Sequence, residues 1–344
     1  MQHGTGSFDT ALADPIETTG SLQDAARNLL LDCGALKPGQ RVVILAEDPA
    51  LGWYDAICPA VTARLAAELG AEVSVLPVGG PDSGVGLLTE AVFEQADLRI
   101  YFARIGDQSR FCAQPAHGIS VMVYARLAET FGSDFGVRPH AEMLALKERV
   151  NRRLFEASEI RITCPRGTEL RGTPPRSGSE PEDVTVRRFP MCMPAPMPAA
   201  GFSGRVALAG YLAPTGSRAY EPASLKLDTT VFAEIDGGRI TGHTGAAEDV
   251  AAIQRHYDHV SALFGIDPGV VHSWHAGIHA GCSFPGMPEA NPDLWSNSVF
   301  GSPAYLHFHT CGDYAPGEIC WMVADPMVVA DGETFWSHGR LHLD

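Results

Sequence analysis

The stretch Arg41-Val-Val-Ile-Leu-Ala46 decides the fold of the first half of the chain. A continuous apolar run of this length is typical of a strand that is buried on both faces of a parallel sheet. Helices and strands are expected to alternate around it, and such alternation predicts an open, doubly wound α/β domain. The expected helices are 21–36, 55–69 and 86–95, and the other strands are 72–78, 98–102 and 119–123.

A charged helix expected over 139–157 marks the boundary between two domains, 1–157 and 158–344. A chain of 344 residues is longer than a single core usually requires. The sequence pattern changes in the second half and predicts an α+β domain, with a hairpin that turns at Arg166-Gly167. The stretch 173–204, rich in Pro, Gly, Ser and Met and including Met191–Pro198, predicts a packed surface loop near a site. Further strands are expected near 205–211, 225–235, 238–242, 304–310 and 318–324, with a helix near 246–264.

Composition narrows the possible partners and the compartment. The formal charge of −16 argues against nucleic-acid binding, which requires a basic face. No apolar run approaches eighteen residues and the N-terminal residues lack a signal-peptide pattern, so we expect neither a membrane span nor export. The eight cysteines include no CxxC pair, which favours reduced thiols in a cytoplasmic protein. The first strand is not followed by GxGxxG, so a dinucleotide site has no support.

Eight of the thirteen histidines fall between positions 243 and 309, and two of them form the pair His307-Phe308-His309. If this segment is a strand, both imidazoles point to the same face. With a third imidazole supplied from elsewhere in the chain, they describe the ligand set of a mononuclear metal centre. Histidines in strands are also commonly solvated or hydrogen-bonded core residues, and that alternative stays open.

The order of segments resembles the M29 (aminopeptidase T-like) peptidase family over nearly the whole chain. The resemblance is carried by Asn28–Ile44, by Arg161–Leu170, by Gly237-Gly-Arg-Ile-Thr-Gly242 and by the last hundred residues. It implies the aminopeptidase T-like fold, homo-oligomers and a metal-dependent site in the second domain. The peptidases hold two metal ions with several carboxylates, and this sequence departs from that set. Ser302 stands where a glutamate ligand would be, and Glu318-Ile-Cys320 replaces a His-x-Asp pair.

A second branch of that fold, the mononuclear iron 2,5-dihydroxypyridine 5,6-dioxygenases, is more similar. By this resemblance His275, in His-Ala-Gly-Ile, matches the first metal ligand and His307 the second, and His309 stands where the branch has aspartate. The branch's pocket histidine after the strand 98–102 is absent, and Gly106-Asp107 occupies that region. The resemblance therefore implies a different substrate or proton donor.

We expect this centre to cleave a hydroxylated N-heterocycle or aromatic ring with Fe²⁺ and dioxygen. Three histidines leave Fe²⁺ with a charge of +2, which favours a small anionic substrate. The alternative is a single-metal zinc hydrolase or an M29-type aminopeptidase that acts on an amide or ring bond. Three histidines and an open position also describe catalytic Zn²⁺. Supporting roles are expected for His279 and Asp313 in catalysis, and for Arg104 and Ser302 in contacts with the substrate.

Overall fold

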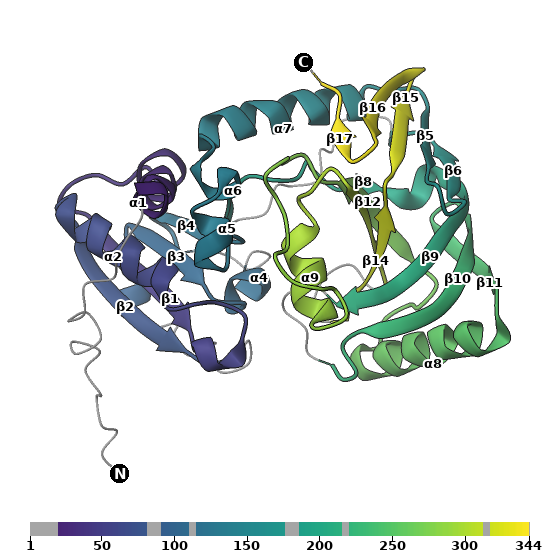
Figure 1. The fold of residues 1–344 in the computed structure, drawn as a ribbon, viewed down its shortest axis with the longest axis horizontal. Coiled ribbons are helices and arrows are strands. Elements are labelled where there is room, and N and C mark those ends of the chain that lie inside the picture. The colour runs from purple at the N-terminus through teal and green to yellow at the C-terminus, as the bar shows by residue number, and fades with distance from the viewer. Residues whose placement is uncertain are drawn as a thin grey trace, which may run out of the picture.

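The computed structural model describes residues 20–80, 91–109, 115–175, 186–214, 220–311 and 317–343. Two bodies lie side by side, one built mainly from the first half of the chain and one from the second (Figure 1). Within the described residues, no helix is both long and apolar enough to cross a membrane.

The first body contains a five-stranded parallel sheet in the order β2-β1-β3-β4-β7. The predicted apolar strand, β1, lies inside this sheet between β2 and β3, and its four successive positions 42–45 are buried. The expectation of a parallel α/β sheet is therefore confirmed. The strands are β1 (Arg41–Glu47), β2 (Glu72–Val78), β3 (Leu98–Phe102), β4 (Ile119–Val123) and β7 (Arg187–Phe189).

Strand β7 comes from beyond the expected domain boundary near 157–158, yet it pairs with β4 at the edge of the first sheet. The chain thus returns to the first body before it continues into the second. The stretch 191–197 follows this strand and is largely buried, not on the surface as expected. The amide of Ile278 donates to the carbonyl of Cys192 at 2.9 Å, which fixes this stretch against the second body.

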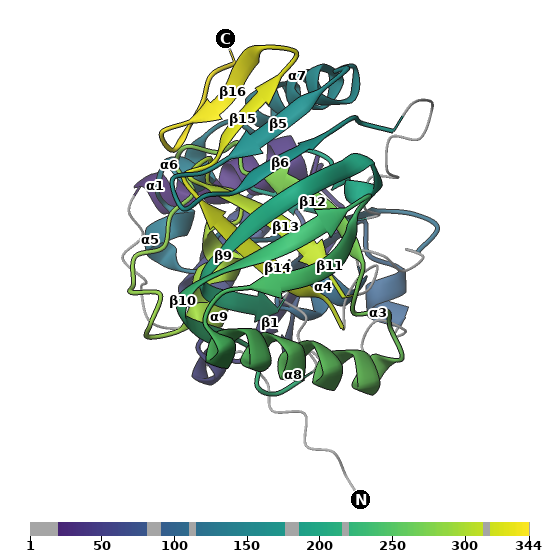
Figure 2. The same ribbon diagram turned by 90° about the vertical axis from the view of Figure 1, so that its right-hand side faces the viewer.

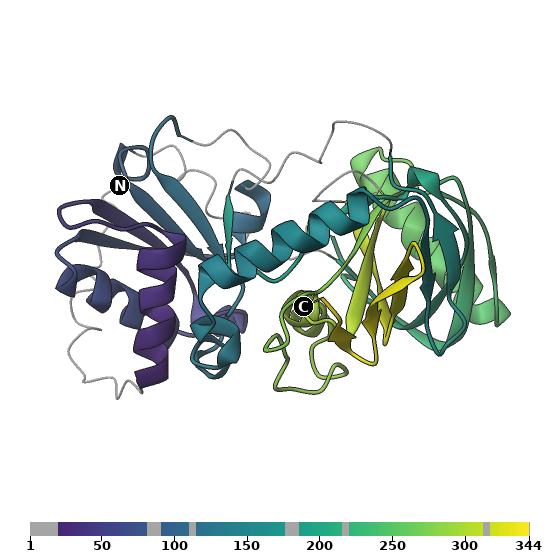
Figure 3. The same ribbon diagram turned by 90° about the horizontal axis from the view of Figure 1, so that it is seen from above.

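Helices pack around the first sheet, and the longest of them, α7, runs between the two bodies (Figure 3). The first predicted helix is continuous but changes to π geometry halfway and ends before Gly34. The helices are α1 (Gly20–Arg27), η2 (Asn28–Cys33), η3 (Pro49–Leu51), α2 (Ile57–Glu68), α3 (Ala91–Glu94), α4 (Ile105–Ser109), α5 (Ala128–Phe131), α6 (Asp134–Val137) and α7 (His140–Phe155).

The second body is built on a strongly curled antiparallel sheet, so it is richer in β-structure than the expected α+β domain (Figure 2). The long strand β9 pairs with β6, β10 and β14, and in this way it joins the two parts of the sheet. The strands are β5 (Ile160–Thr163), β6 (Glu169–Gly172), β8 (Met197–Pro198), β9 (Phe202–Pro214), β10 (Leu225–Asp236), β11 (Arg239–Thr244), β12 (Val271–Ala276), β13 (Tyr305–Thr310), β14 (Ile319–Ala324), β15 (Met327–Ala330), β16 (Glu333–Ser337) and β17 (Arg340–Leu341).

Two main helices cover this sheet from different sides (Figures 1 and 2). Helix α8 (Ala247–Phe264) packs along β10, and the hydroxyl of its Tyr257 accepts a hydrogen bond from Nε1 of Trp321 at 2.7 Å. Helix α9 (Pro292–Val299) lies between the sheet and the first body and is capped at its start by Asn291. A short 3-10 turn, η6 (Ala199–Gly201), precedes β9.

Asn28, in the motif that carries the sequence resemblance, ties the first helix to the entrance of α7. Its buried side chain donates to the carbonyls of Gly136 and Arg138, at 2.9 and 2.7 Å, and accepts from the amide of His140 at 2.9 Å. These three backbone groups come from the segment that leads into α7. The amide of Asn28 thereby helps to fix the direction in which the bridging helix leaves the first body.

We predict that Asn28→Ala lowers the free energy of unfolding by about 2–4 kcal/mol, because buried backbone groups lose their partners. Chemical denaturation followed by tryptophan fluorescence measures this change. Asp32→Ala, at an exposed position of the same helix, is the control and is expected to change stability by about 0.5 kcal/mol or less. Equal losses of stability in the two variants would contradict the role of the Asn28 hydrogen bonds.

Candidate metal centre

The candidate centre lies on two neighbouring antiparallel strands, β12 and β13. Their register sets His275 opposite His307, and Ser273 opposite His309. Because side chains alternate across a strand, these four residues share one face of the sheet. The opposite face carries Trp274, Phe308 and Trp321, which are completely buried in the hydrophobic core. The large rings therefore fix the orientation of both strands, since a slip of one residue would bury the histidines in that core.

A close backbone approach holds the loops at the open end of these strands. A Cβ on Gly277, two residues after His275, would lie 2.2 Å from the carbonyl carbon of Gly301. Glycine is therefore required at this position, and its carbonyl accepts a hydrogen bond from Nε1 of Trp336 at 2.8 Å. The segment that follows His275 is in this way packed against the segment that precedes β13.

The three predicted imidazoles come together in the folded chain. The ring of His275 lies between the other two, with its centroid 5.4 Å from that of His307 and 5.0 Å from that of His309. Nε2 of His309 and Nε2 of His275 are hydrogen-bonded to each other at 2.9 Å. Two nitrogens that each sit about 2.1 Å from one ion are about 3 Å apart when they subtend a right angle. The spacing of this pair therefore suits two neighbouring ligands of one ion.

His307 completes the cluster as a neutral base. Burial lowers its pKa well below the ordinary range, and the nearby His309 lowers it further. Its Nε2 is buried and has no hydrogen-bond partner among the described residues. The rings of His307 and His275 are nearly parallel, with an angle of 13° between their planes, so His307 stacks on its neighbour. A buried polar nitrogen without a partner is costly in a dry protein, and a bound ion would satisfy it.

Glu318, at the start of β14 (Ile319–Ala324), engages the other nitrogen of His309. Its Oε1 lies 2.5 Å from Nδ1 of His309, and its side chain is 4% exposed. A buried carboxylate requires a positive partner or a strong donor. A proton on Nδ1 meets that need and leaves the lone pair of Nε2 directed toward His275. Histidine ligands of metal ions are commonly oriented by a carboxylate in this way.

The carboxylate changes the charge balance expected from the sequence. Three histidines and a divalent cation carry +2, but Glu318 brings one negative charge into contact with His309. The net charge of the whole cluster with its ion is then +1, as it would be with a carboxylate ligand. The centre itself therefore attracts an anionic substrate less strongly than a cluster of charge +2 would.

A second set of donors shares His309. Nδ1 of His309, a carboxylate oxygen of Glu318 and Sγ of Cys320 all lie within 4.8 Å of one another. Cys320 is directly opposite His309 in the β13–β14 register, and its Sγ is 3.7 Å from Nδ1. The same imidazole could bind an ion through Nε2 with the other histidines, or through Nδ1 with Glu318 and Cys320. The sequence indicated Glu318 and Cys320 only as departures from a family pattern.

The other predicted site residues make contacts with residues outside the histidine cluster. His279 lies in the turn after β12, where its Nδ1 accepts from the amide of Gly281 at 3.1 Å and its ring packs edge-on against Phe135. The hydroxyl of Ser302 faces the amide of Ala304 at 3.4 Å, in the turn before β13. Asp313 lies outside the described residues.

Arg104 lies in the first body, just beyond the end of β3. Its Nε donates to Oε1 of Glu47 at 2.8 Å, and its amide donates to the other carboxylate oxygen of Glu47 at 2.8 Å. The guanidinium also stacks on Trp53, 4.4 Å from the ring centroid. A buried carboxylate of the protein itself thus already neutralises the arginine that we expected to contact the substrate.

No protein-family model matches the sequence, and the search of curated proteins finds no relative. Solved structures, however, share the fold over almost the whole chain. The 2,5-dihydroxypyridine dioxygenase from Pseudomonas putida KT2440 is similar with a TM-score of 0.63 and 13% identity, covering 96% of this chain and 99% of that one. Wild-type AmpT from Thermus thermophilus is similar with a TM-score of 0.55 and 13% identity, covering 94% and 99%. The chain therefore has the aminopeptidase T-like fold that the sequence resemblance implies.

We predict that Glu318→Gln weakens the binding of a divalent ion by about ten- to a hundredfold, because the neutral amide accepts less strongly from Nδ1 of His309. Competition with a fluorescent chelator measures the affinity. Glu289→Gln, at an exposed position, is the control and is expected to leave the affinity unchanged. An unaltered affinity in Glu318→Gln would contradict the role assigned to this carboxylate.

Burial also predicts an acid-sensitive contribution of His279 to stability. Burial, together with the charge of Arg138, lowers the pKa of His279 to about 4. The unfolded chain therefore binds more protons than the folded chain between about pH 4 and the ordinary histidine pKa near 6.5. Stability from this group is fully present above about pH 6.5 and falls as the pH drops toward 4.

We predict that His279→Gln makes the free energy of unfolding less dependent on pH within this window. Urea denaturation of both proteins at pH 4.5, 5.5 and 7.5 measures the slope, and the values at pH 7.5 correct for any lost packing. Parallel curves for the two proteins would show that His279 is not held neutral by burial.

Proposed function

We propose that this chain is a metalloenzyme that binds one divalent cation through His275, His307 and His309. The observation that carries the proposal is the 2.9 Å spacing between Nε2 of His275 and Nε2 of His309, with Glu318 on the far nitrogen of His309. The unpartnered Nε2 of His307 adds a third donor in the same cluster. We further propose that the ion is Fe²⁺ and that the reaction opens a hydroxylated aromatic or heterocyclic ring with dioxygen.

We propose one bound ion, whereas the aminopeptidases that the sequence resembles hold two. Two cations about 3.5–4 Å apart require bridging carboxylates to offset their repulsion. Among the described residues, the carboxylate in contact with the cluster is Glu318, and it faces Nδ1 of His309. The likeness in fold to a dihydroxypyridine dioxygenase supports the choice of ring cleavage.

Each residue of the cluster has a defined task in this proposal. Burial keeps His307 neutral, so its lone pair is available at ordinary pH. Glu318 holds the proton on Nδ1 of His309 and so directs Nε2 toward the shared site. The ring of Phe300 packs edge-on against that of His307, with 6.1 Å between the ring centroids. Bound Fe²⁺ would supply the redox chemistry and the open positions for a bidentate substrate and dioxygen.

A zinc hydrolase is the second candidate, and one observation favours it. The donor group of His309, Glu318 and Cys320 contains a thiol, which is a ligand typical of Zn²⁺. In that case an amide or ring bond of the substrate would be hydrolysed without oxygen. The two candidates differ in the metal, in the ligands and in the need for oxygen.

Protein purified without oxygen distinguishes the two reactions. We predict that it contains close to one iron per chain and consumes dioxygen when given a hydroxylated pyridine or benzene. Elemental analysis and an oxygen electrode measure both quantities, and readdition of Fe²⁺ after chelation is expected to restore the uptake. Zinc in the purified protein, together with turnover that does not depend on oxygen, would favour the hydrolase.

The three-histidine site makes a separate prediction. His275→Ala removes the ring that contacts both other imidazoles, so the iron content is expected to fall at least about tenfold. His338→Ala, at an exposed position, is the control and is expected to retain the metal. Circular dichroism checks that both variants are folded. Full metal content in His275→Ala would overturn this ligand set.

A further inference from the structure

The facing positions of β12 and β13 form four corners of one patch on the sheet. His275 faces His307 at two of them, and Ser273 faces His309 at the other two. Side chains that face each other in an antiparallel pair have Cβ atoms about 4.5–5.5 Å apart. Three corners therefore carry imidazoles, and the fourth carries the much smaller side chain of Ser273. The cluster has less side-chain volume at this corner than at the other three.

A β-bulge brings His272 to the same side of β12 as Ser273. The register pairs Val271 with Thr310 and Ser273 with His309, so β12 has one residue more than β13 at this point. In a regular strand, neighbouring side chains point to opposite faces. Here, however, Nδ1 of His272 lies within hydrogen-bonding distance, 3.1 Å, of the hydroxyl oxygen of Ser273. The bulge therefore turns His272 toward the patch, and bulges that re-aim a side chain are frequent next to active sites.

The hydrogen-bonded pair of Ser273 and His272 leads from the buried patch toward solvent. Ser273 is 3% exposed, whereas His272 is only partly buried. A hydroxyl can donate one hydrogen bond and accept two, and a neutral imidazole accepts at one nitrogen. Histidine is also the side chain that gains and loses protons most readily at ordinary pH. The pair can therefore carry a proton from the fourth corner of the patch to the outside of the molecule.

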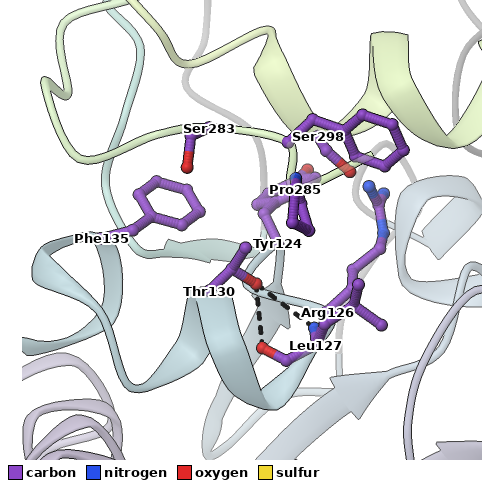
Figure 4. Close-up of a pocket in the computed structure, with 9 residues that line it drawn as sticks. Tyr124, Arg126, Leu127, Thr130, Phe135, Ser283, Pro285 and Ser298 are labelled. Atoms are coloured by element: carbon purple, nitrogen blue, oxygen red, sulfur yellow. Dashed lines mark hydrogen bonds between the residues drawn. The ribbon is translucent and has the colours of Figure 1, made fainter. Parts of the chain in front are cut away.

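The pocket between the two bodies does not offer a comparable place for a ligand (Figure 4). Tyr124 and Pro285 are among its lining residues, and Phe300 packs edge-on against both Tyr124 and His307. Its cavity volume of about 10 Å³ is enough for roughly one water molecule. The side of His307 that faces this pocket is therefore occupied by aromatic packing, which favours the corner at Ser273 for a larger ligand.

We infer that a ligand of the histidine cluster binds over Ser273, and that Ser273 and His272 together accept a proton from a hydroxyl of that ligand. The inference rests on the proposed function, because it takes the ligand to be a hydroxylated ring. The O–H bond of the ligand breaks and its proton passes to Oγ of Ser273, while the hydroxyl proton of Ser273 passes to Nδ1 of His272. The ligand is left as an anion and His272 as an imidazolium, which can return its extra proton to water.

Titration of the iron-loaded full chain with 4-nitrocatechol, without oxygen, tests the inference. The absorption spectrum of this hydroxylated ring changes with the loss of each proton, so it reports the ionisation of the bound probe without any turnover. We expect the unaltered chain to bind the probe in its doubly ionised form. Ser273→Ala and His272→Gln are expected to bind it about ten- to a hundredfold more weakly and in a less ionised form, because a charge-assisted hydrogen bond and the proton acceptor are lost.

Further variants separate the hydroxyl of Ser273 from the space that its small side chain leaves. Ser273→Thr keeps the hydroxyl and is expected to retain the ionised probe. Ser273→Leu fills the corner and is expected to lose the probe while it keeps the iron. Ser158→Ala and His338→Gln, at exposed positions, are the matched controls and are expected to behave as the unaltered chain does. Circular dichroism checks that each variant is folded, and His272→Gln keeps the test valid if a variant of Ser273 is not.

The iron content of every sample is measured beside the spectrum. Full iron content together with a weaker, less ionised probe in Ser273→Ala and His272→Gln supports the inference. An unaltered spectrum and affinity in both folded variants would overturn it and leave the metal centre intact. Loss of iron from either variant would show that the pair supports the metal ligands, and would overturn the inference as well. An unaltered chain that binds no iron would instead overturn the proposed function.

Discussion

The register between β12 and β13 is the constraint on which the candidate site depends. It places His275 opposite His307 and Ser273 opposite His309, while Trp274 and Phe308 enter the core from the same two strands. Burial of those two large rings stabilises the fold by several kcal/mol, and the same pairing holds the imidazoles together. Burial of these rings in the hydrophobic core therefore stabilises the strand pairing that holds the polar cluster together.

Much of the fold could be predicted from the sequence, because the apolar pattern is strong where the sheet is buried. Strand β1 is apolar from Val42 to Ala46, and β13 follows the alternation that set His307 and His309 on one face. Strand β7 was not predicted, since Arg187-Arg-Phe189 is short and charged, and its partner lies far away in sequence. The terminal strands β15 to β17 and helix α9 were also missed, because each is short and takes its stability from tertiary contacts.

The histidine donors of the candidate site could be predicted from the sequence, but the charged residue that contacts them could not. A period of two identifies His307 and His309, and the resemblance adds His275. The role of Glu318 depends on the β13–β14 pairing, which no local pattern reveals. Arg104, which we expected to contact the substrate, is instead paired with Glu47.

We propose that the ion binds among the imidazoles and not between Glu318 and Cys320. X-ray absorption at the metal edge of the iron-loaded chain distinguishes the two positions. We expect a shell of nitrogen and oxygen donors only, with the outer scattering of at least two imidazole rings. A sulfur neighbour at about 2.3 Å, the distance typical of a metal–thiolate bond, would identify Cys320 as a ligand and rule out the three-histidine site.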